Sequence, residues 1–445
     1  MIAGLKPYPE YRDSGVSWLG RIPSHWDVLP NRAIFAEARD NNHPEERMLS
    51  VTIAQGVIPQ KTLLEGSSKK DSSNQNKSAY KLVCPGDIAY NKMRAWQGAI
   101  GASGYCGIIS PAYIVQRLRD GSDPRYFHWL YRTPSFAKEA ERWSYGITPD
   151  MWSLRPEHFK MIYSMKPPQV EQEAIARFAD FVNRQLESAI RAKKRLIAVL
   201  NENKQVIIHR AVTRGLDPDV RLRPSGIPWL SEIPEQWELR RLKWVARLQR
   251  GYDLPSEKRN PGSIPVVSSG GIIDTHSVSR ATGPGVAMGR YGSTDSVFYI
   301  ESDFWPHNTA LYVTDFQGND CRWCYYLLRT ISKGDYAGKS AVPGVDRKDL
   351  YEIIVPRPSR IEQRQIAESI DAQLADSERA TERVVRELDL IREYRTRLIA
   401  DVVTGQLDVR AAADRLPIDV EESALVEPDE EDEPEELLGT VAAHG

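Results

Sequence analysis

The sequence has few cysteines and no long apolar run. Four of its 445 residues are cysteine, far too few for a disulfide-stapled secreted scaffold. No stretch approaches the roughly 20 apolar residues needed to cross a bilayer. Residues 1–15 lack the apolar core of a signal peptide. We therefore expect a cytoplasmic protein without a membrane partner, large enough for two or three domains.

The sequence also lacks the common signatures of catalysis. It has no Gly-rich cofactor fingerprint after a strand, no G-x-S-x-G motif and no metal-type cluster among its eight histidines. Residues 334–340 resemble a phosphate-binding loop, but Lys333 stands where the first glycine is required. Cys321 and Cys324 have no second pair at zinc spacing, so we expect them on one side of a buried helix.

The net charge of -2 hides an asymmetry along the chain. Between Leu416 and Gly445 there are eleven acids and no Lys or Arg, so residues 1–415 hold 59 bases against 50 acids, a charge of +9. A basic body suits a protein that binds a polyanion, and we expect residues 411–445 to form a disordered acidic tail. A solvated surface with a solubilising tail explains the same charges.

The chain contains one long internal repeat. Residues 14–26 recur as residues 225–237, with seven identities at an offset of 211. Further on the offset falls to 191, because the second copy is shorter in its middle. The anchors at this offset are Pro167 and Pro358, Glu171-Gln172 and Glu362-Gln363, Ile175-Ala176 and Ile366-Ala367, and Val212-Thr213 and Val403-Thr404. The repeat predicts two copies of one structural unit.

Each copy has two parts with different periodicity. The first part, residues 14–166 or 225–357, is rich in Gly, Pro, aromatic residues and short β-branched runs, which indicates a mixed α/β globule. The second part, residues 170–213 or 361–404, contains no Pro or Gly and carries apolar residues on a 3,4 spacing. This spacing predicts two long amphipathic helices, each roughly 65 Å long at 1.5 Å per residue. Prolines precede both helices, and Gly215 and Gly405 follow them.

Neither helix can bury so long an apolar stripe alone. If the duplicated halves pack about a two-fold axis, the two helices form one antiparallel pair; alternatively, each helix packs only on its own domain. The residues expected to form the helix pair and to dock partners are Ile175, Val182, Ile190, Leu196, Val199, Ile370, Leu374, Val384, Leu388 and Ile391.

Two pairs of loops in the globules are candidates for contacting nucleic acid. Aligned at an offset of 198, residues 86–92 match residues 284–290, and each copy delivers a base into a Gly-rich turn after a short strand. A second pair, residues 145–148 and 336–340, recurs at the offset of 191. Solvated bases and structural turns remain the alternatives. The candidates are Lys92, Arg94, Trp96, Tyr145, Thr148, Arg290, Tyr291, Ser293, Lys339 and Ser340.

An ordered set of motifs resembles the specificity subunit of a type I restriction-modification enzyme. The motifs are Asp13-Ser14-Gly15, Trp18-Leu19-Gly20, Ile22-Pro23 and Trp26 with their partial second copy, Gly86-Asp87-Ile88 with Ser110-Pro111-x-Tyr113, Pro167-Pro168-x-x-Glu171-Gln172, and Val403-Thr404-Gly405. The resemblance covers about residues 6–410. The acidic tail departs from the family's pattern.

The resemblance implies an α+β fold with internal pseudo-two-fold symmetry and a non-catalytic role. Two target-recognition domains, residues 1–166 and, with a linker, 215–357, would each read one half of a bipartite, asymmetric site in double-stranded DNA. Two central antiparallel helices, residues 167–214 and 358–410, would hold them apart.

The resemblance also implies partners that carry the cofactors. The helices would dock two methyltransferase subunits, which bind S-adenosylmethionine and methylate adenine at N6. Motor-nuclease subunits that use ATP and Mg²⁺ would then cleave unmodified DNA. The specificity subunit itself would bind no cofactor.

Two other classes of function remain open on the residues alone. A self-sufficient nuclease or modification enzyme would require an acidic metal site, and only scattered triplets such as Asp346-Arg347-Lys348 are present. A coiled-coil assembly protein whose globules bind protein would require no DNA contact. Salt-sensitive duplex binding would separate the last class from a DNA reader.

Overall fold

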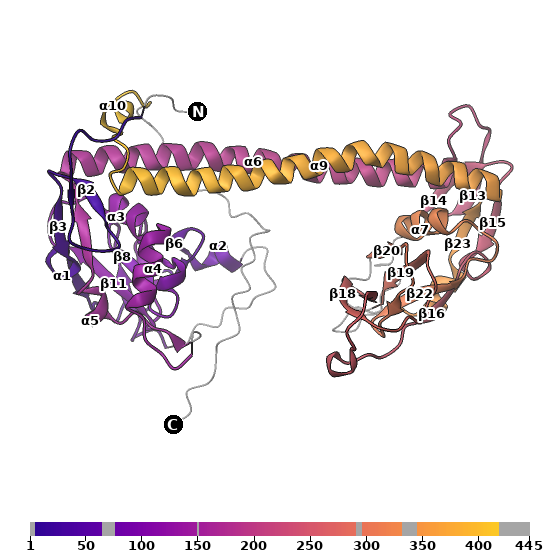
Figure 1. The fold of residues 1–445 in the computed structure, drawn as a ribbon, viewed down its shortest axis with the longest axis horizontal. Helices are drawn as coiled ribbons and strands as arrows, with labels where there is room; N and C mark the ends of the chain where they lie inside the picture. Colours follow the sequence, from indigo (N-terminus) through magenta and orange to yellow (C-terminus); the bar gives the residue numbers. More distant parts are fainter. Residues whose placement is uncertain (1–4, 65–75, 149–150, 291–295, 332–344, 418–445) are drawn as a thin grey trace. The chain divides into compact units, whose positions relative to one another are not determined.

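The chain folds into two compact units, each with a globular domain and parts of two long helices (Figure 1). Unit 1 comprises Met1–Arg191 and Leu388–Gly445, and unit 2 comprises Ala192–Glu387. The predicted fold class, a mixture of α/β domains and long helices, is confirmed. The computed structural model describes residues 5–64, 76–148, 151–290, 296–331 and 345–417.

An antiparallel four-stranded sheet forms the centre of the globular domain of unit 1. Its strand order is β4-β11-β8-β9, and α3 packs against β8 and β9. The strands are β4 (Phe35–Ala38), β8 (Ile88–Asn91), β9 (Ile100–Ala102) and β11 (Tyr113–Leu118). Around them lie β1 (Tyr11–Asp13), β2 (Arg21–Pro23), β3 (Asp27–Pro30), α1 (Asn31–Ile34), β5 (Leu49–Thr52), β6 (Gly56–Pro59), α2 (Gln60–Leu64), β7 (Lys81–Val83), η1 (Ala95–Gln97), β10 (Gly107–Ile109), α3 (Pro124–Tyr131), α4 (Pro134–Arg142), α5 (Pro156–Phe159) and β12 (Tyr163–Lys166).

The globular domain of unit 2 repeats this sheet with the same connectivity. Its strand order is β16-β22-β19-β20, and α7 packs against β19 and β20. The strands are β16 (Arg247–Arg250), β19 (Gly285–Gly289), β20 (Val297–Ile300) and β22 (Ala310–Asp315). Around them lie β13 (Leu222–Ile227), β14 (Leu230–Pro234), β15 (Glu238–Arg241), η3 (Leu242–Trp244), η4 (Ser256–Lys258), β17 (Ile264–Ser268), β18 (Gly271–His276), β21 (Trp305–Pro306), α7 (Cys321–Thr330), α8 (Arg347–Glu352) and β23 (Ile354–Arg357).

The two long helices are α6 (Gln169–Arg214) and α9 (Arg360–Val403). Both end where the sequence predicts, at glycines with left-handed backbone: φ is 78° at Gly215 and 75° at Gly405. Among the described residues, no helix has the length and apolar character to span a membrane.

Within each unit, α6 and α9 run antiparallel and share a hydrophobic core. In unit 1, Glu187 of α6 forms an ion pair with Arg395 of α9. In unit 2, Lys193 lies 2.5 Å from Glu387. Ile175, near the start of α6, shares a core with Val403 at the end of α9, and Ile208, near the end of α6, shares a core with Ile366 near the start of α9. The predicted antiparallel pairing is therefore present in both units (Figure 1). The buried members of the predicted pair are Ile175, Val182, Ile190, Ile370, Leu374, Val384 and Leu388, and Ile391 is half-buried.

The prediction that Leu196 and Val199 lie in the helix seam is wrong. Their exposed fractions are 41% and 54%, whereas Ile197 and Leu200, one position round the helix, are half-buried. A strict seven-residue repeat drifts about 20° per heptad on a straight helix with 3.6 residues per turn. The apolar stripe that starts at Ile175 therefore turns away from the seam after two to three heptads.

The repeated Trp and Glu residues attach each domain to the start of its long helix. The indole N–H of Trp26 donates to Glu171 of α6 at 2.9 Å, and that of Trp237 donates to Glu362 of α9 at 2.9 Å. A Cβ on Gly405 would lie 2.8 Å from Trp26, so the end of α9 also packs on this tryptophan. These contacts explain why both copies retain the motif.

The glutamine that follows each glutamate holds the next helix of its domain. The backbone N–H of Asp123 donates to Gln172 at 2.9 Å, and that of Asp320 donates to Gln363 at 2.8 Å. These two aspartates are the N-caps of α3 and α7. The paired Glu-Gln anchors thus fix both the N-terminal motif and the first turn of a domain helix.

An aspartate further along α6 forms a second attachment in unit 1. Asp180 accepts a hydrogen bond from the indole N–H of Trp129 at 2.7 Å and lies 3.4 Å from the guanidinium of Arg125. Burial raises the pKa of the Asp180 carboxyl, and the bond from Trp129 opposes that rise.

The equivalent attachment in unit 2 uses Asp371 of α9. Its carboxylate lies 2.6 Å from Arg322 and accepts a hydrogen bond from the hydroxyl of Tyr326. Arg322 also stacks over Tyr299, with 4.4 Å between its guanidinium carbon and the ring centroid. The same aspartate position therefore clamps an arginine and an aromatic residue in both copies.

The folded chain extends further than the predicted domain boundary at residue 411. The short helix α10 (Arg410–Ala413) packs on unit 1, where Ala413 is fully buried. Arg410 lies 3.3 Å from Glu171, and Arg177 donates a hydrogen bond to the carbonyl of Ala413. The start of the predicted tail was therefore wrong by several residues. Residues 418–445 lie outside the described residues.

Candidate nucleic-acid interface

The predicted bases Lys92 and Arg290 occupy equivalent positions at the ends of central strands. Lys92 follows β8, and Arg290 follows β19. The start of β8 lies beside α3, because a Cβ on Gly86 would contact Pro124 at 3.7 Å. The start of β19 lies beside α7, because Cys321 contacts the carbonyl of Pro284 at 3.4 Å. Both bases therefore lie at the end of the sheet away from the attachment to the long helix.

In both units the backbone bonds at this end of the sheet involve the predicted base. The N–H of Leu154 donates to the carbonyl of Lys92 at 2.8 Å, and that of Val345 donates to the carbonyl of Arg290 at 2.9 Å. Leu154 and Val345 are 191 residues apart, the offset of the loops that precede them. In unit 1, where both predicted loops are described, Lys92 and Tyr145 line one pocket, so the two loops are parts of one surface.

In unit 1 the second loop is held by its own backbone. Tyr145 and Ser153 form an antiparallel bridge, and the N–H of Met151 donates to the carbonyl of Thr148 at 2.9 Å. A Cβ on Gly146 would lie 2.4 Å from the backbone of Met151, so only glycine fits there. Residues 336–340 of unit 2, with Lys339 and Ser340, lie outside the described residues, as do Tyr291 and Ser293.

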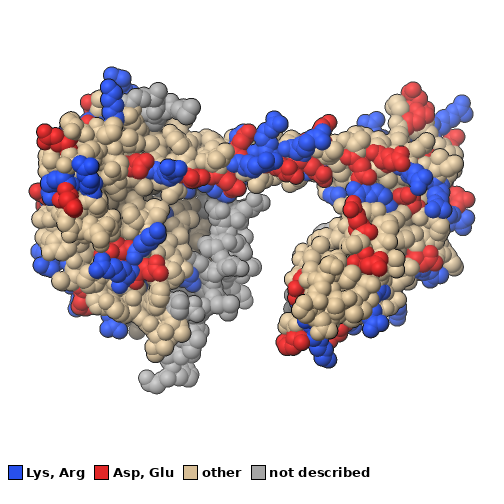
Figure 2. Space-filling view, viewed as in Figure 1, with Lys and Arg blue, Asp and Glu red and all other residues tan. Residues whose placement is uncertain are grey.

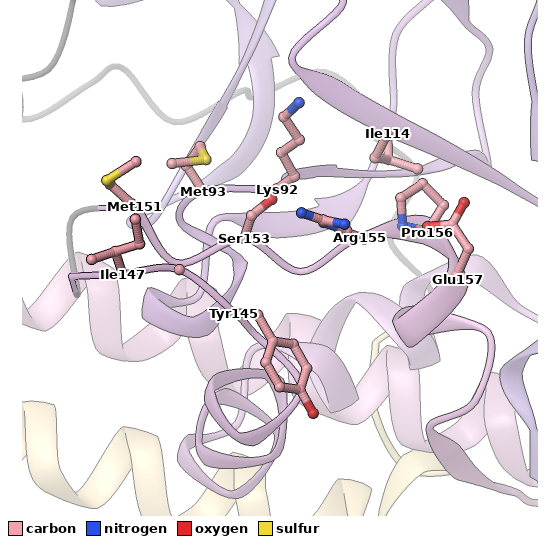
Figure 3. Close-up of a pocket in the computed structure, with 11 residues that line it drawn as sticks. Lys92, Met93, Ile114, Tyr145, Ile147, Met151, Ser153, Arg155, Pro156 and Glu157 are labelled. Atoms are coloured by element: carbon pink, nitrogen blue, oxygen red, sulfur yellow. The ribbon is translucent and has the colours of Figure 1, made fainter.

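The two loops of unit 1 line an open pocket of about 590 Å³ (Figure 3). Lys92 comes from the first loop and Tyr145 from the second, so two predicted residues meet here. Ile147 and Met151 lie together on one side, and Lys92 and Arg155 lie toward the other (Figure 3). The pocket combines apolar side chains with two cations.

Two other predicted residues of the first loop have structural partners. The indole N–H of Trp96 donates to the carbonyl of Met93 at 2.9 Å, and its ring packs edge-on against Trp152 at 5.5 Å. Arg94 donates to the side chain of Gln97 at 3.2 Å. Trp96 therefore braces the loop that carries Lys92, and its contact with nucleic acid stays a prediction.

Arg132 holds the backbone around the first loop, and the sequence did not indicate this role. Its guanidinium donates to four backbone carbonyls, those of Ile53, Ala54, Gly98 and Ile100, at 2.5–3.3 Å. Burial lowers the pKa of Arg132 to about 10, so the group stays charged at neutral pH. No local pattern reveals this role, because all four acceptors are backbone atoms of other elements.

His128 lies one turn before Arg132 and is held neutral. Burial lowers the pKa of its imidazole to about 3, and its Nδ1 accepts a hydrogen bond from the N–H of Ala102 at 3.2 Å. A Cβ on Gly101 would come within 2.9 Å of this ring. His128 is therefore a packed structural group.

Unit 2 carries cation-aromatic clusters that the sequence did not identify. Arg280 stacks over Tyr252 and Trp305, at 5.6 and 5.2 Å from the ring centroids. Such stacking orients a guanidinium while leaving its fork of donors available. Among the described residues, no group of three His, Cys, Asp or Glu side chains is arranged to hold a metal ion.

The sequence alone could have revealed the aspartate clamps. Asp180 and Asp371 are identical residues at the offset of 191, and Arg125 and Arg322 recur at an offset of 197. Arg155 had no such signal, because the position 191 residues later is Asp346. The predicted buried helix around Cys321 and Cys324 is confirmed as α7.

The structure thus contains a duplicated sheet domain, and each copy is attached to a long helix and carries a half-buried base at the end of a central strand. Residues 234–385 match the family model of the type I restriction modification DNA specificity domain. The matched residues lie in unit 2, and the resemblance predicted from the sequence is confirmed there.

The fold is similar to that of a solved structure from work on complex assembly and conformational transition of the type I R-M system. The TM-score is 0.64 at 13% identity, covering 87% of this chain and 99% of that chain. The HsdS subunit from Thermoanaerobacter tengcongensis gives a TM-score of 0.41 at 15% identity, with coverages of 86% and 96%. The S subunit from M. genitalium gives 0.38 at 14% identity, with coverages of 85% and 96%. No curated protein matches significantly in sequence.

Proposed function

We propose that this chain is the DNA sequence-recognition subunit of a type I restriction-modification complex. Each globular domain reads one half of a bipartite, asymmetric site in double-stranded DNA. The observation that carries this proposal is the recurrent base at the end of a central strand, whose carbonyl accepts a backbone bond in both units, from Leu154 to Lys92 and from Val345 to Arg290. The two copies present different side chains there, as two different half-sites require.

The charge of the folded body supports a phosphate-binding surface. Residues 1–415 carry a formal charge of +9. Phosphate contacts from such a body supply affinity that falls with salt, while a few side chains at the loop junctions supply discrimination between bases.

Exposed apolar residues on the long helices support the docking of partner subunits. Val199 and Leu390 are 191 residues apart, and their exposed fractions are 54% and 63%. Other exposed positions of α9 form ion pairs, such as Arg386 with Glu382 and Arg397 with Glu393, and both signs of charge alternate along the helices in Figure 2. Two methyltransferase subunits would dock at these equivalent positions.

The chemistry of the complex belongs to the partners in this proposal. S-adenosylmethionine binds to the methyltransferase subunits, which methylate adenine at N6. ATP and Mg²⁺ bind to the motor-nuclease subunits, which restrict unmodified DNA. This chain contributes recognition and scaffolding and binds no cofactor itself.

Methylation mapping tests the proposal directly. The chain is expressed with its methyltransferase subunit in a host without other adenine methylation, and modified adenines are located by long-read sequencing. We expect one motif made of two specific half-sites separated by an unread gap. Replacing residues 225–357 with the matching segment of another family member should change only one half-site. A single contiguous motif, or no new methylation, would contradict the proposal.

A further inference from the structure

The pocket of unit 1 displays apolar side chains that the fold does not bury. The exposed fractions are 91% for Ile147, 57% for Tyr145 and 54% for Met151. One exposed apolar residue is ordinary, but three around one cavity indicate a binding surface. The Tyr145–Ser153 bridge and the close approach at Gly146 fix the backbone at the base of this loop.

The charges around these side chains identify the kind of partner. Lys92 and Arg155 line the same pocket, and Glu157 is its one acidic lining residue. The pocket lies at the far end of β8, on the surface formed by both predicted loops. Two cations beside an apolar wall are complementary to a polyanion that also presents an apolar group.

Duplex DNA presents one apolar group of this kind in its major groove. The edges of the base pairs carry hydrogen-bond donors and acceptors, and thymine alone adds a 5-methyl group. A cavity of about 590 Å³ is larger than one methyl group and admits the edge of the base that bears it.

We propose that this pocket reads a thymine in the half-site of unit 1 through its 5-methyl group. Ile147 contacts the methyl group, while Lys92 and Arg155 bind the adjoining phosphate or base edge. The inference rests on the proposed function and adds one specificity-determining contact to it. Tyr145 also lines the pocket, and its ring packs against His158 with 4.9 Å between ring centroids.

Replacement of thymine by uracil removes only the methyl group, so it tests the proposal at one atom. The assembled complex is bound to its mapped bipartite DNA, and each dT of the half-site is replaced in turn by dU in competition assays. We expect one replacement to weaken binding by about fourfold, the loss expected for one buried methyl group.

The variant Ile147→Ala should abolish that sensitivity, so that it binds dT and dU duplexes equally. Its matched control is Ile272→Ala, an isoleucine of unit 2 with an exposed fraction of 67%, which should keep the full difference between dT and dU. Thermal unfolding should be the same for both variants, because both side chains are exposed.

Three results would overturn the inference. Sequence-specific binding without any effect of dU would remove the methyl contact and leave the proposed function standing. An effect of dU that persists in Ile147→Ala would assign the contact to another residue. An equal loss on dT and dU duplexes in Ile147→Ala would indicate an apolar wedge between base steps. If the assembled complex binds DNA without any sequence preference, the proposed function itself is contradicted.

Discussion

The two copies of the repeat agree where they hold the long helices and differ where they would meet DNA. Trp26 and Trp237 make the same bond to a glutamate of their helix. At the far end of the sheet, by contrast, the first copy has Lys92 where the second copy has Arg290. Both domains attach to similar helices, so the same contacts serve in both copies. The loop surfaces differ, as the proposed recognition of two different half-sites requires.

The largest expected effect comes from removing a tryptophan of the attachment. Trp26→Ala or Trp237→Ala should each destabilise its own unit by about 4 kcal/mol, because a buried indole and its hydrogen bond are lost. Hydrogen exchange should show faster opening in that unit alone. Trp244→Ala, at a side chain that is half exposed, serves as control. Equal opening of both units would mean that the copies are not independently attached.

Changing the bases at the strand ends should separate the two half-sites. Lys92→Ala should weaken binding of the unaltered DNA site by about 1 to 3 kcal/mol. It should also relax discrimination between bases, but only in the half-site of unit 1. Arg290→Ala should do the same for the other half-site. Binding competitions with duplexes mutated in one half at a time measure this. A loss that is uniform over all sequences would assign the residue to phosphate contact.

The aspartate clamps should differ in strength between the copies. Asp371→Ala should cost unit 2 about 2 kcal/mol, because Arg322 and Tyr326 both lose their acceptor and the pair is only partly exposed. Asp180→Ala should cost less, about 1 kcal/mol, because burial already disfavours that carboxylate. Urea unfolding of both variants measures the difference. A larger loss in Asp180→Ala would reverse this ranking.

Acidification should weaken unit 1 through His128. The pKa of this imidazole is about 3 in the folded protein, against about 6.5 in the unfolded chain, so below pH 6.5 only the unfolded state takes up the proton. Stability from this group is complete above pH 6.5 and falls by about 1–2 kcal/mol between pH 7 and 5.

The variant His128→Gln isolates this effect, because all other groups titrate as before. Its unfolding free energy should fall less between pH 7 and 5 than that of the natural protein. Unit 2 has Tyr325 at the equivalent position of α7, so it lacks this particular histidine. An identical pH slope with and without His128 would contradict the burial argument.

The smallest effect on stability is expected at the exposed helix positions. Val199→Asp and Leu390→Asp should each change the free energy of unfolding by no more than about 0.5 kcal/mol. If the two positions dock one methyltransferase subunit each, native mass spectrometry should show a complex that has lost one subunit. Full assembly in both variants would place the docking surface elsewhere.

Much of the fold was predictable because its signals are local or duplicated. The absence of Pro and Gly over residues 170–213 predicted α6, and Gly215 marked its end. The meeting of Lys92 with Leu154 was not predictable, because a hydrogen bond across 62 residues leaves no periodic trace in one sequence. Arg155 was missed for the same reason: only the folded pocket brings it beside Lys92.

The amino-acid order suffices to define two copies of one unit and two long helices, since helical periodicity and repeated motifs are properties of the chain itself. Which face of α6 enters the seam depended on its partner helix, and the drift of the stripe left Leu196 outside. The pocket of unit 1 likewise forms only after folding, because it joins a strand end, a loop and the start of α5. Contacts between distant residues depend on packing of the whole domain, and no local pattern encodes them.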